Sequence, residues 1–152
     1  MMQKQHVKIY FRLPSDTDGY PPVSVESVWA KKAIGPNQYT LDNVPFFART
    51  ATEGDLVAAS ESEGRLWFDK IIEKSGNSLI RIVLFDVSRC SEVRKQLLDW
   101  GCCSEWSEAH NLIAVNVPPK TELAEVQRYL QEQSKHGYLD YEEPILRQSN
   151  GS

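Results

Sequence analysis

The feature that most constrains this chain is the run from Leu79 to Phe85, in which Arg81 is the only polar residue. Apolar positions that do not alternate with polar ones are typical of a strand covered on both faces. The run is too short to cross a bilayer, which requires about 20 apolar residues. We therefore expect a central strand at this position.

Two helical patterns follow that strand. The first has four apolar residues on one helical face and stops at a glycine: Cys90, Val93, Leu97, Trp100 and then Gly101. The second follows two prolines and repeats the pattern before another glycine: Leu123, Val126, Leu130 and then Gly137. Strand-like segments at 102–109, 112–117 and 138–146 complete the order β-α-β-β-α-β, which is the ferredoxin-like plan.

The first half of the chain has a different pattern. Apolar residues alternate from Val7 to Leu13, and short strand-like runs are separated by turn residues such as Gly35-Pro36-Asn37. We therefore predict an α+β fold, with a bent N-terminal antiparallel β-sheet or partial barrel packed with a C-terminal ferredoxin-like βαββαβ unit. The expected boundaries are a mainly-β subdomain at 1–77, an α+β subdomain at 78–147 and a flexible tail at 148–152.

Composition limits the classes of function. The three cysteines lack the spacing of zinc ligands, and the histidines belong to no zinc or nucleophile motif, so we expect no metal, no cofactor and no enzymatic activity. The net charge of −4 argues against a nucleic-acid partner. The N-terminus has no apolar signal-peptide segment, so we expect a cytoplasmic protein without a membrane association.

The acidic excess lies in the second half, where residues 78–152 carry 8 basic and 11 acidic side chains. A solvated face is one interpretation of these carboxylates. The alternative is a patch for a basic protein partner, in which charge speeds the encounter and aromatic side chains anchor it. The candidate partner-binding residues are Glu105, Trp106, Glu108, Tyr138, Asp140, Tyr141, Glu142 and Glu143.

A second cluster combines Asp42-Asn43 with Phe46-Phe47. In a structural interpretation, Asp and Asn close a turn and the phenylalanines fill the sheet. In a functional interpretation, the aromatics form the floor of a ligand cleft between the two halves. The candidate cleft residues are Trp29, Asp42, Asn43, Phe46, Phe47 and Trp67.

These motifs also carry a resemblance that extends over about residues 7–145. The matching pieces are Pro21-Pro22-Val23, Glu26-Ser27, Trp29-Ala30, Tyr39, Leu41-Asp42-Asn43, Pro45-Phe46-Phe47-Ala48, Gly54-Asp55 and Ser75-Gly76-Asn77-Ser78. In combination they resemble the bacterial domain-of-unknown-function 4265 (DUF4265) family. The resemblance implies a small cytosolic bacterial protein and carries over no catalytic residues.

Size, acidity and the missing catalytic motifs lead to one functional expectation. We expect a non-enzymatic protein-binding module, and more narrowly an immunity protein (antitoxin) that neutralises a basic toxin domain, such as a nuclease, by occlusion. The alternative is a small-molecule sensor or RNA-associated regulator that uses the cleft between the halves. An unfamiliar enzyme would require two or more of Asp55, Asp86 and His110 in one cleft. The sequence predicts no particular oligomeric state.

Overall fold

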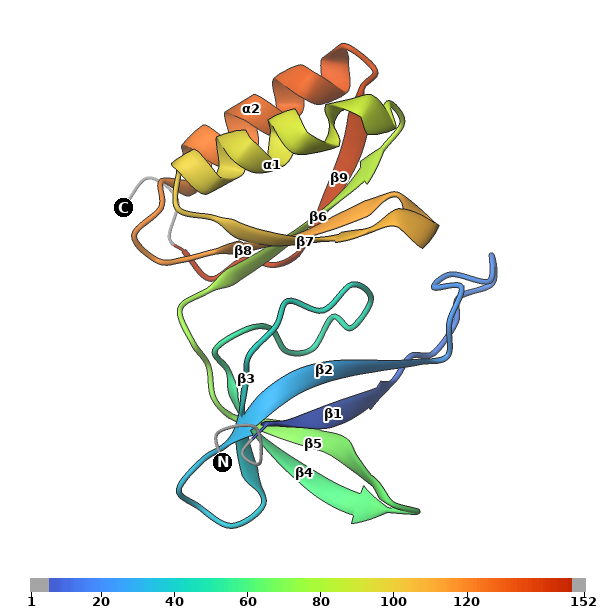
Figure 1. The fold of residues 1–152 in the computed structure, drawn as a ribbon, viewed down its shortest axis with the longest axis vertical. Coiled ribbons are helices and arrows are strands. Elements are labelled where there is room, and N and C mark those ends of the chain that lie inside the picture. Colours follow the sequence, from blue (N-terminus) through green and yellow to red (C-terminus); the bar gives the residue numbers. More distant parts are fainter. Residues whose placement is uncertain (1–5, 149–152) are drawn as a thin grey trace. The chain divides into compact units, whose positions relative to one another are not determined.

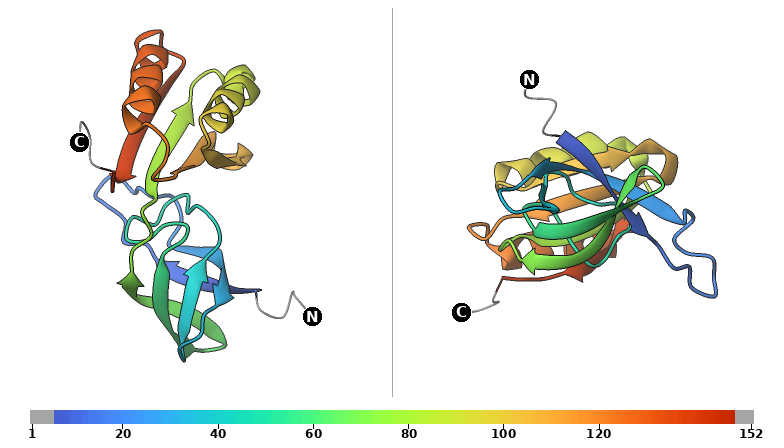
Figure 2. Two further views of the ribbon diagram at one scale, coloured as in Figure 1. Left: turned by 90° about the vertical axis from the view of Figure 1, so that its left-hand side faces the viewer. Right: turned by 90° about the horizontal axis from the view of Figure 1, so that it is seen from below.

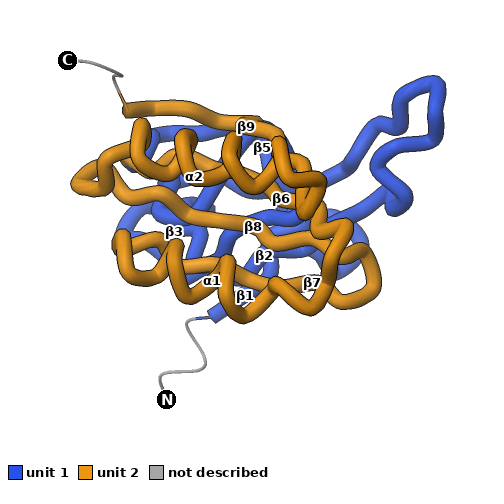
Figure 3. The backbone as a smooth tube through the Cα atoms, turned by 90° about the horizontal axis from the view of Figure 1, so that it is seen from above, with its two compact units in different colours: residues 1–75 blue, residues 76–152 orange. Residues whose placement is uncertain are grey.

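The computed structural model describes residues 6–148 and divides the chain into two compact units, residues 1–75 and 76–152 (Figure 3). The described residues form two sheets and two α-helices, which is an α+β fold. In the predicted tail, the Gln148 amide donates to the carbonyl oxygen of Pro118 at 2.7 Å. The rest of that tail, 149–152, lies outside the described residues.

The N-terminal unit is a five-stranded sheet in which each strand pairs antiparallel with the next. A short parallel pairing of β1 with β5, in which Tyr10 lies opposite Trp67, closes the strands into a ring. Alternation along β1 buries Ile9 and Phe11 and leaves Lys8 exposed. The strands are β1 (His6–Arg12), β2 (Val25–Lys32), β3 (Gln38–Leu41), β4 (Leu56–Ser62) and β5 (Arg65–Glu73).

The C-terminal unit is a four-stranded antiparallel sheet with the order β7-β8-β6-β9. Both helices lie on one face of this sheet, as Figure 1 and Figure 2 show. The elements are β6 (Ser78–Leu84), the 3-10 helix η2 (Val87–Arg89), α1 (Cys90–Asp99), β7 (Cys103–Ser107), the 3-10 helix η3 (Glu108–His110), β8 (Leu112–Val117), α2 (Leu123–Lys135) and β9 (Leu139–Ile145).

The core of the C-terminal unit confirms the two predicted helical faces. Val93 and Leu97 of α1, and Val126 and Leu130 of α2, are completely buried. They pack in one cluster with apolar residues of the sheet, including Ile82. The 3.6-residue spacing of these side chains therefore determines which side of each helix meets the sheet.

Strand β6 is central, as its composition predicts. It pairs with β8 on one side and β9 on the other, and every residue except Val83 is buried. The strand predicted at 102–109 ends earlier, at Ser107. The chain there enters η3, and Asn111 takes the left-handed backbone conformation with φ of 53°. Asparagine tolerates that conformation better than most residues, so it makes the reversal into β8 possible.

The neighbours Leu97 and Leu98 provide a test of this core, because the first is fully buried and the second is 61% exposed. We expect Leu97→Ala to lower the free energy of unfolding by about 2–5 kcal/mol, through lost burial and the cavity that remains. Leu98→Ala should change it by less than about 0.5 kcal/mol. Denaturant unfolding followed by circular dichroism measures both, and equal effects would contradict the assigned helix face.

Candidate functional site

The carboxylate of Glu26 holds the loop that contains the two phenylalanines. It accepts hydrogen bonds from the backbone N–H groups of Phe46, Phe47 and Ala48 at 2.5, 2.9 and 2.8 Å. Hydrogen bonds to a charged acceptor each contribute about 1.5–3 kcal/mol. Phe47 is buried, and its ring meets that of Tyr20 edge-on at 6.0 Å. Glu26 and the Pro45–Ala48 motif are therefore two halves of one structural contact.

Asp55 has a similar role. Its side chain is completely buried, and its two oxygens accept the N–H groups of Thr52 and Ser75, both at 2.9 Å. The Ser75 hydroxyl donates in turn to the carbonyl oxygen of Glu53 at 3.0 Å. Asp55 therefore joins the turn before β4 to the end of the unit. This accounts for the Gly54-Asp55 motif and for the serine that opens the last motif.

Three of the six predicted cleft residues line one hollow in the N-terminal unit. Trp29, Asp42 and Asn43 border an open space of about 540 Å³, together with His6. The His6 Nε2 atom lies 3.3 Å from the Asp42 carboxylate, and the Asp42 N–H donates to the Trp29 carbonyl oxygen at 2.8 Å. Sequence reasoning missed His6 because its neighbourhood depends on the pairing of β1 with β2.

The other three predicted cleft residues lie elsewhere in the unit. The backbone N–H groups of Phe46 and Phe47 are held by Glu26, and the Phe47 side chain is buried. Trp67 is on β5, beside Tyr10 of β1, with their ring centres 5.7 Å apart. None of the three is among the residues that line the hollow of Asp42.

Trp67 belongs to a surface that sequence reasoning did not assemble. The side chains that point out of the ring on three adjacent strands place aromatic rings next to cations. We call this surface the outer face, and its residues are Lys8, Tyr10 and Arg12 of β1, Trp29 of β2, and Arg65 and Trp67 of β5. Figure 1 shows β1 between β2 and β5. Alternation marks these residues as outward-facing, but only the strand order makes them neighbours.

The predicted acidic set does not form one patch, because its members lie at opposite edges of the C-terminal sheet. Glu105 and Trp106 are on β7, whereas Asp140 to Glu143 are on β9, with β8 and β6 between them. Three strand spacings separate the two edges by about 14 Å. Glu108 follows β7 in η3 and belongs to the same edge as Glu105.

Two members of that set already have partners within the unit. Glu142 lies 3.4 Å from Arg81, whose side chain is only 2% exposed. The Arg89 guanidinium carbon lies 3.7 Å from the Tyr138 ring centre, and the His136 ring centre lies 5.6 Å from it. Both residues therefore stabilise the unit itself, whatever else they contact.

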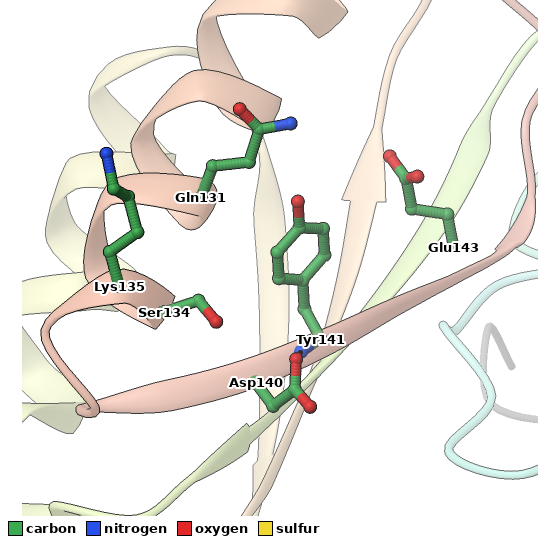
Figure 4. A pocket seen from close by; sticks show the side chains of 6 residues that line it. All are labelled: Gln131, Ser134, Lys135, Asp140, Tyr141 and Glu143. Carbon is green, nitrogen blue, oxygen red and sulfur yellow. Dashed lines mark hydrogen bonds between the residues drawn. The ribbon is translucent and has the colours of Figure 1, made fainter.

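A second hollow, of about 590 Å³, combines three members of the set with helix α2. Figure 4 shows the Tyr141 ring directed toward α2, between Gln131 and Glu143. Burial raises the pKa of Tyr141, and the Glu143 carboxylate adds to the increase. Glu143 also accepts a hydrogen bond from Gln127 at 2.6 Å. The remaining residues that line this hollow are Ser134, Lys135 and Asp140.

All three cysteines, none of them in a disulfide, border a hollow of about 440 Å³ beside α1. Burial raises the pKa of Cys102 to about 11, and it also raises the pKa of Cys90. Cys103 is exposed. Within residues 6–148, no group of three His, Cys, Asp or Glu side chains has the arrangement of a metal site.

The three residues of the enzyme alternative have structural contacts. Asp55 accepts the backbone N–H groups of Thr52 and Ser75, as described above. The Asp86 carboxylate caps η2 by accepting the N–H of Ser88 at 3.1 Å. The His110 Nδ1 atom lies 3.2 Å from the Ser107 hydroxyl oxygen, in the turn between β7 and β8. In the described part of the chain, neither helix combines the length and the apolar character that a membrane crossing requires.

The model of the DUF4265 family, described as a domain of unknown function, matches residues 26–141. The chain belongs to the DUF4265 family. The match begins at Glu26 and includes the Pro45–Ala48 loop and Asp55, so it spans both structural contacts described above. Membership confirms the family expected from the motifs.

One solved structure shows the same fold as this DUF4265 member. It is a crystal structure of a hypothetical protein from Neisseria gonorrhoeae, with a TM-score of 0.75 and 23% sequence identity. The similarity covers 94% of this chain and 96% of the other. No curated protein matches the sequence.

The Glu26 contact yields a prediction for DUF4265 stability. Glu26→Gln keeps the shape of the side chain but replaces one acceptor oxygen with a donor, which leaves a backbone N–H without its partner. We expect the free energy of unfolding to fall by about 1–3 kcal/mol, measured by denaturant unfolding. Glu61→Gln, at an exposed position of β4, is the control and should have an effect within about 0.5 kcal/mol. Similar values for the two variants would show that the contact contributes little.

The cysteines yield a second prediction, because burial disfavours the reactive thiolate. With a pKa of about 11, Cys102 is ionised in only about one molecule in a thousand at pH 8. We expect iodoacetamide at that pH to label the exposed Cys103 first, and Cys102 to react only when the pH approaches 11 or the unit unfolds. Mass spectrometry of the digested protein gives the order. Rapid labelling of Cys102 at pH 8 in the folded protein would contradict its burial.

Proposed function

We propose that the protein is a non-enzymatic binding module that docks a basic protein partner on the β9 edge of its C-terminal unit. The narrower form of the proposal is an immunity protein (antitoxin) that occludes a basic toxin domain, such as a nuclease. The observation that carries it is the composition of β9, an edge strand with Asp140, Glu142 and Glu143 around Tyr141.

The position of β9 supports this proposal. Among the described residues β9 pairs only with β6, so its other side offers backbone N–H and C=O groups to a partner. Asp140 is exposed, and Tyr141 and Glu143 are half-buried beside it. Lys135 borders the same hollow and offsets part of the negative charge. The 8 basic and 11 acidic side chains of residues 78–152 favour a basic partner over an acidic one.

The remaining members of the acidic set either lie at the other edge of the sheet or already contact an arginine. Glu105, Trp106 and Glu108 lie at the β7 edge, so a partner that reaches both edges must span the full width of the sheet. Glu142 and Tyr138 are held by Arg81 and Arg89. We therefore assign the attraction chiefly to Asp140 and Glu143, with Tyr141 as the aromatic anchor.

The small-molecule sensor is a second candidate, favoured by the hollow of about 540 Å³ at Asp42. The His6 ring, the Asp42 carboxylate beside it and the Asn43 amide would orient a polar ligand, and Trp29 would contact its apolar part. The hollow is open, whereas sites for small ligands usually bury most of the ligand surface. For that reason we favour the protein-binding function over the small-molecule sensor.

We also propose a more specific fold for each unit and a location for the protein. The order β6-α1-β7-β8-α2-β9, with the sheet order β7-β8-β6-β9, supports a ferredoxin-like description of the C-terminal unit. The parallel contact of β1 with β5 supports a partial barrel in the N-terminal unit. A cytoplasmic location is proposed together with this function.

Charge reversal tests the β9 surface. We expect the tagged protein to retain one basic protein from an extract of its native bacterium at low salt and to lose much of it at high salt. Asp140→Lys combined with Glu143→Lys should lower the affinity for that partner at least tenfold, as measured with the purified pair. The matched control is Glu61→Lys with Glu63→Lys, which makes the same change in net charge at exposed positions of the N-terminal unit.

The comparison of the two double variants decides the outcome. A loss of affinity and of salt dependence confined to the β9 variant supports the proposed surface. Equal losses in both variants would show that net charge alone controls binding. An affinity that neither variant changes would place the partner on another surface.

A further inference from the structure

We propose that the outer face of the N-terminal unit binds single-stranded nucleic acid. The residues of this face are those defined above on β1, β2 and β5, and none of them belongs to the β9 surface. The proposal goes beyond the function proposed for β9 and is independent of it. Three features of the face support it: its cations have no acidic partner among the described residues, its aromatic rings lie on adjacent strands, and contacts within the unit hold both in place.

In the part of the chain that the structure describes, the cations of the outer face have no carboxylate partner. Within residues 6–148, Lys8, Arg12 and Arg65 form no ion pair, and all three side chains are exposed. Other arginines of the chain do have such partners, as Arg89 does in Glu92 at 3.0 Å. Acidic side chains do not neutralise these three cations, so the cations are suited to contact phosphate groups.

The aromatic rings lie on three adjacent strands. Tyr10 of β1 lies directly opposite Trp67 of β5, and Lys8 of β1 lies directly opposite Trp29 of β2. Trp29 is 47% exposed, and the other two rings are half-buried. Aromatic side chains on neighbouring strands form the platform on which unpaired bases stack, and cations beside them follow the backbone.

Cations and rings are held together before any ligand arrives. The Arg12 guanidinium carbon lies 3.9 Å from the ring centre of Trp67, and that of Arg65 lies 4.7 Å from the ring centre of Tyr10. The Lys8 ammonium lies 5.0 Å from the ring centre of Trp29. Because Arg12 and Arg65 are exposed, the outward side of each guanidinium plane can stack on a base or donate to a phosphate. Their long side chains therefore lose less freedom on binding.

The net charge of −4 opposes nucleic-acid binding at long range but has little influence on a local contact. At physiological salt, exposed charges are screened beyond about 8 Å. Two carboxylates adjoin the face, Asp42 in the hollow of Trp29 and Asp69 two residues beyond Trp67 on β5, and the three cations of the face outnumber them. The local balance on the outer face is therefore positive, and we expect contact-driven binding without strong electrostatic steering.

Single-stranded nucleic acid fits this face better than an acidic protein segment does. A carboxylate-rich peptide would use the three cations but would leave the exposed Trp29 ring without a stacking partner. Bases in a duplex are already stacked on each other, so they cannot use the rings either. Only an unpaired strand supplies both phosphates for the cations and free base faces for the rings.

Fluorescence anisotropy with labelled single strands tests the proposal on the full-length protein. The probes are oligouridylate and oligothymidylate of about 12 nucleotides, which is within the length that single-strand sites commonly cover. We expect either or both to bind at low salt, with quenching of tryptophan fluorescence, and the ratio of the two affinities distinguishes RNA from DNA. A duplex of equal length should bind at least tenfold more weakly.

Two sets of variants assign the binding to the outer face. Lys8→Gln, Arg12→Gln and Arg65→Gln together should lower the affinity at least tenfold and reduce the slope of log affinity against log salt by about 2, since each single-strand phosphate contact contributes about 0.7. The matched control is Lys95→Gln, Lys120→Gln and Arg128→Gln, three exposed cations of the C-terminal unit. That control makes the same change in net charge and should leave the slope unchanged.

Stacking is tested at Trp29, whose exposure makes loss of folding a minor concern. Trp29→Leu should weaken binding about tenfold, and Trp29→Phe, which keeps an aromatic ring, should recover most of the loss. Matched thermal unfolding curves verify that each variant is folded. The Asp140→Lys and Glu143→Lys variant should still bind the probes, which separates this proposal from that for β9.

Several outcomes would overturn the proposal. They are no binding of either strand at low salt, equal affinity for the duplex, or equal losses in the two triple variants. Tighter binding of a polyglutamate peptide than of both oligonucleotides would identify the face as a site for an acidic protein instead. Identical affinities for Trp29→Leu and wild type would exclude stacking at that ring.

Discussion

The organisation of the N-terminal unit depends on carboxylates that accept backbone N–H groups at chain reversals. Glu26 reaches from β2 to three consecutive N–H groups of the Pro45–Ala48 loop, and Asp55 accepts two more, from Thr52 before β4 and from Ser75 after β5. A loop of this kind has N–H groups that no strand can satisfy, and leaving them buried without partners would be costly. One acidic side chain thereby determines the path of a loop about 20 residues away. Among the motifs shared with the DUF4265 family, Glu26, the Pro45–Ala48 loop and Gly54-Asp55 are therefore requirements of folding, and these three carry little information about binding.

The two units depend on different forces, and their surfaces differ accordingly. In the C-terminal unit, apolar faces of α1 and α2 cover one side of the sheet, so functional groups are left to its edges and to the outer sides of the helices. In the N-terminal unit the ring encloses a small core, and alternate residues of every strand must point outward. Lys8, Tyr10 and Arg12 point outward because Val7, Ile9 and Phe11 point inward. A surface rich in aromatic and basic residues is thus a by-product of strand geometry that a ligand can use.

Patterns carried by adjacent residues predicted much of the fold. The Leu79–Phe85 run identified the central strand, and the spacing of Val93 and Leu97 identified the buried face of α1, because both signals are local. The contacts between residues on different strands could not be predicted from such local patterns. Glu105 and Glu142 look alike in sequence, yet the sheet order places them at opposite edges. Likewise, Arg12 and Trp67 are far apart in the chain and meet only because β1 pairs with β5. The candidate sites depend on such non-local pairing, so the sequence indicated their residue types but not their assembly.

The pairing of β1 with β5 also sets the order of events during synthesis. The first strand of the N-terminal unit leaves the ribosome early, but the strand that completes its hydrogen bonds ends only at Glu73. Until then β1 has one open side, with outward aromatic residues and an unsatisfied backbone, which is the kind of exposed edge that other chains can join. The Glu26 contact needs only residues up to Ala48, so it can form while the ring is still open. A nascent chain can therefore anchor its central loop first and close its outer face last.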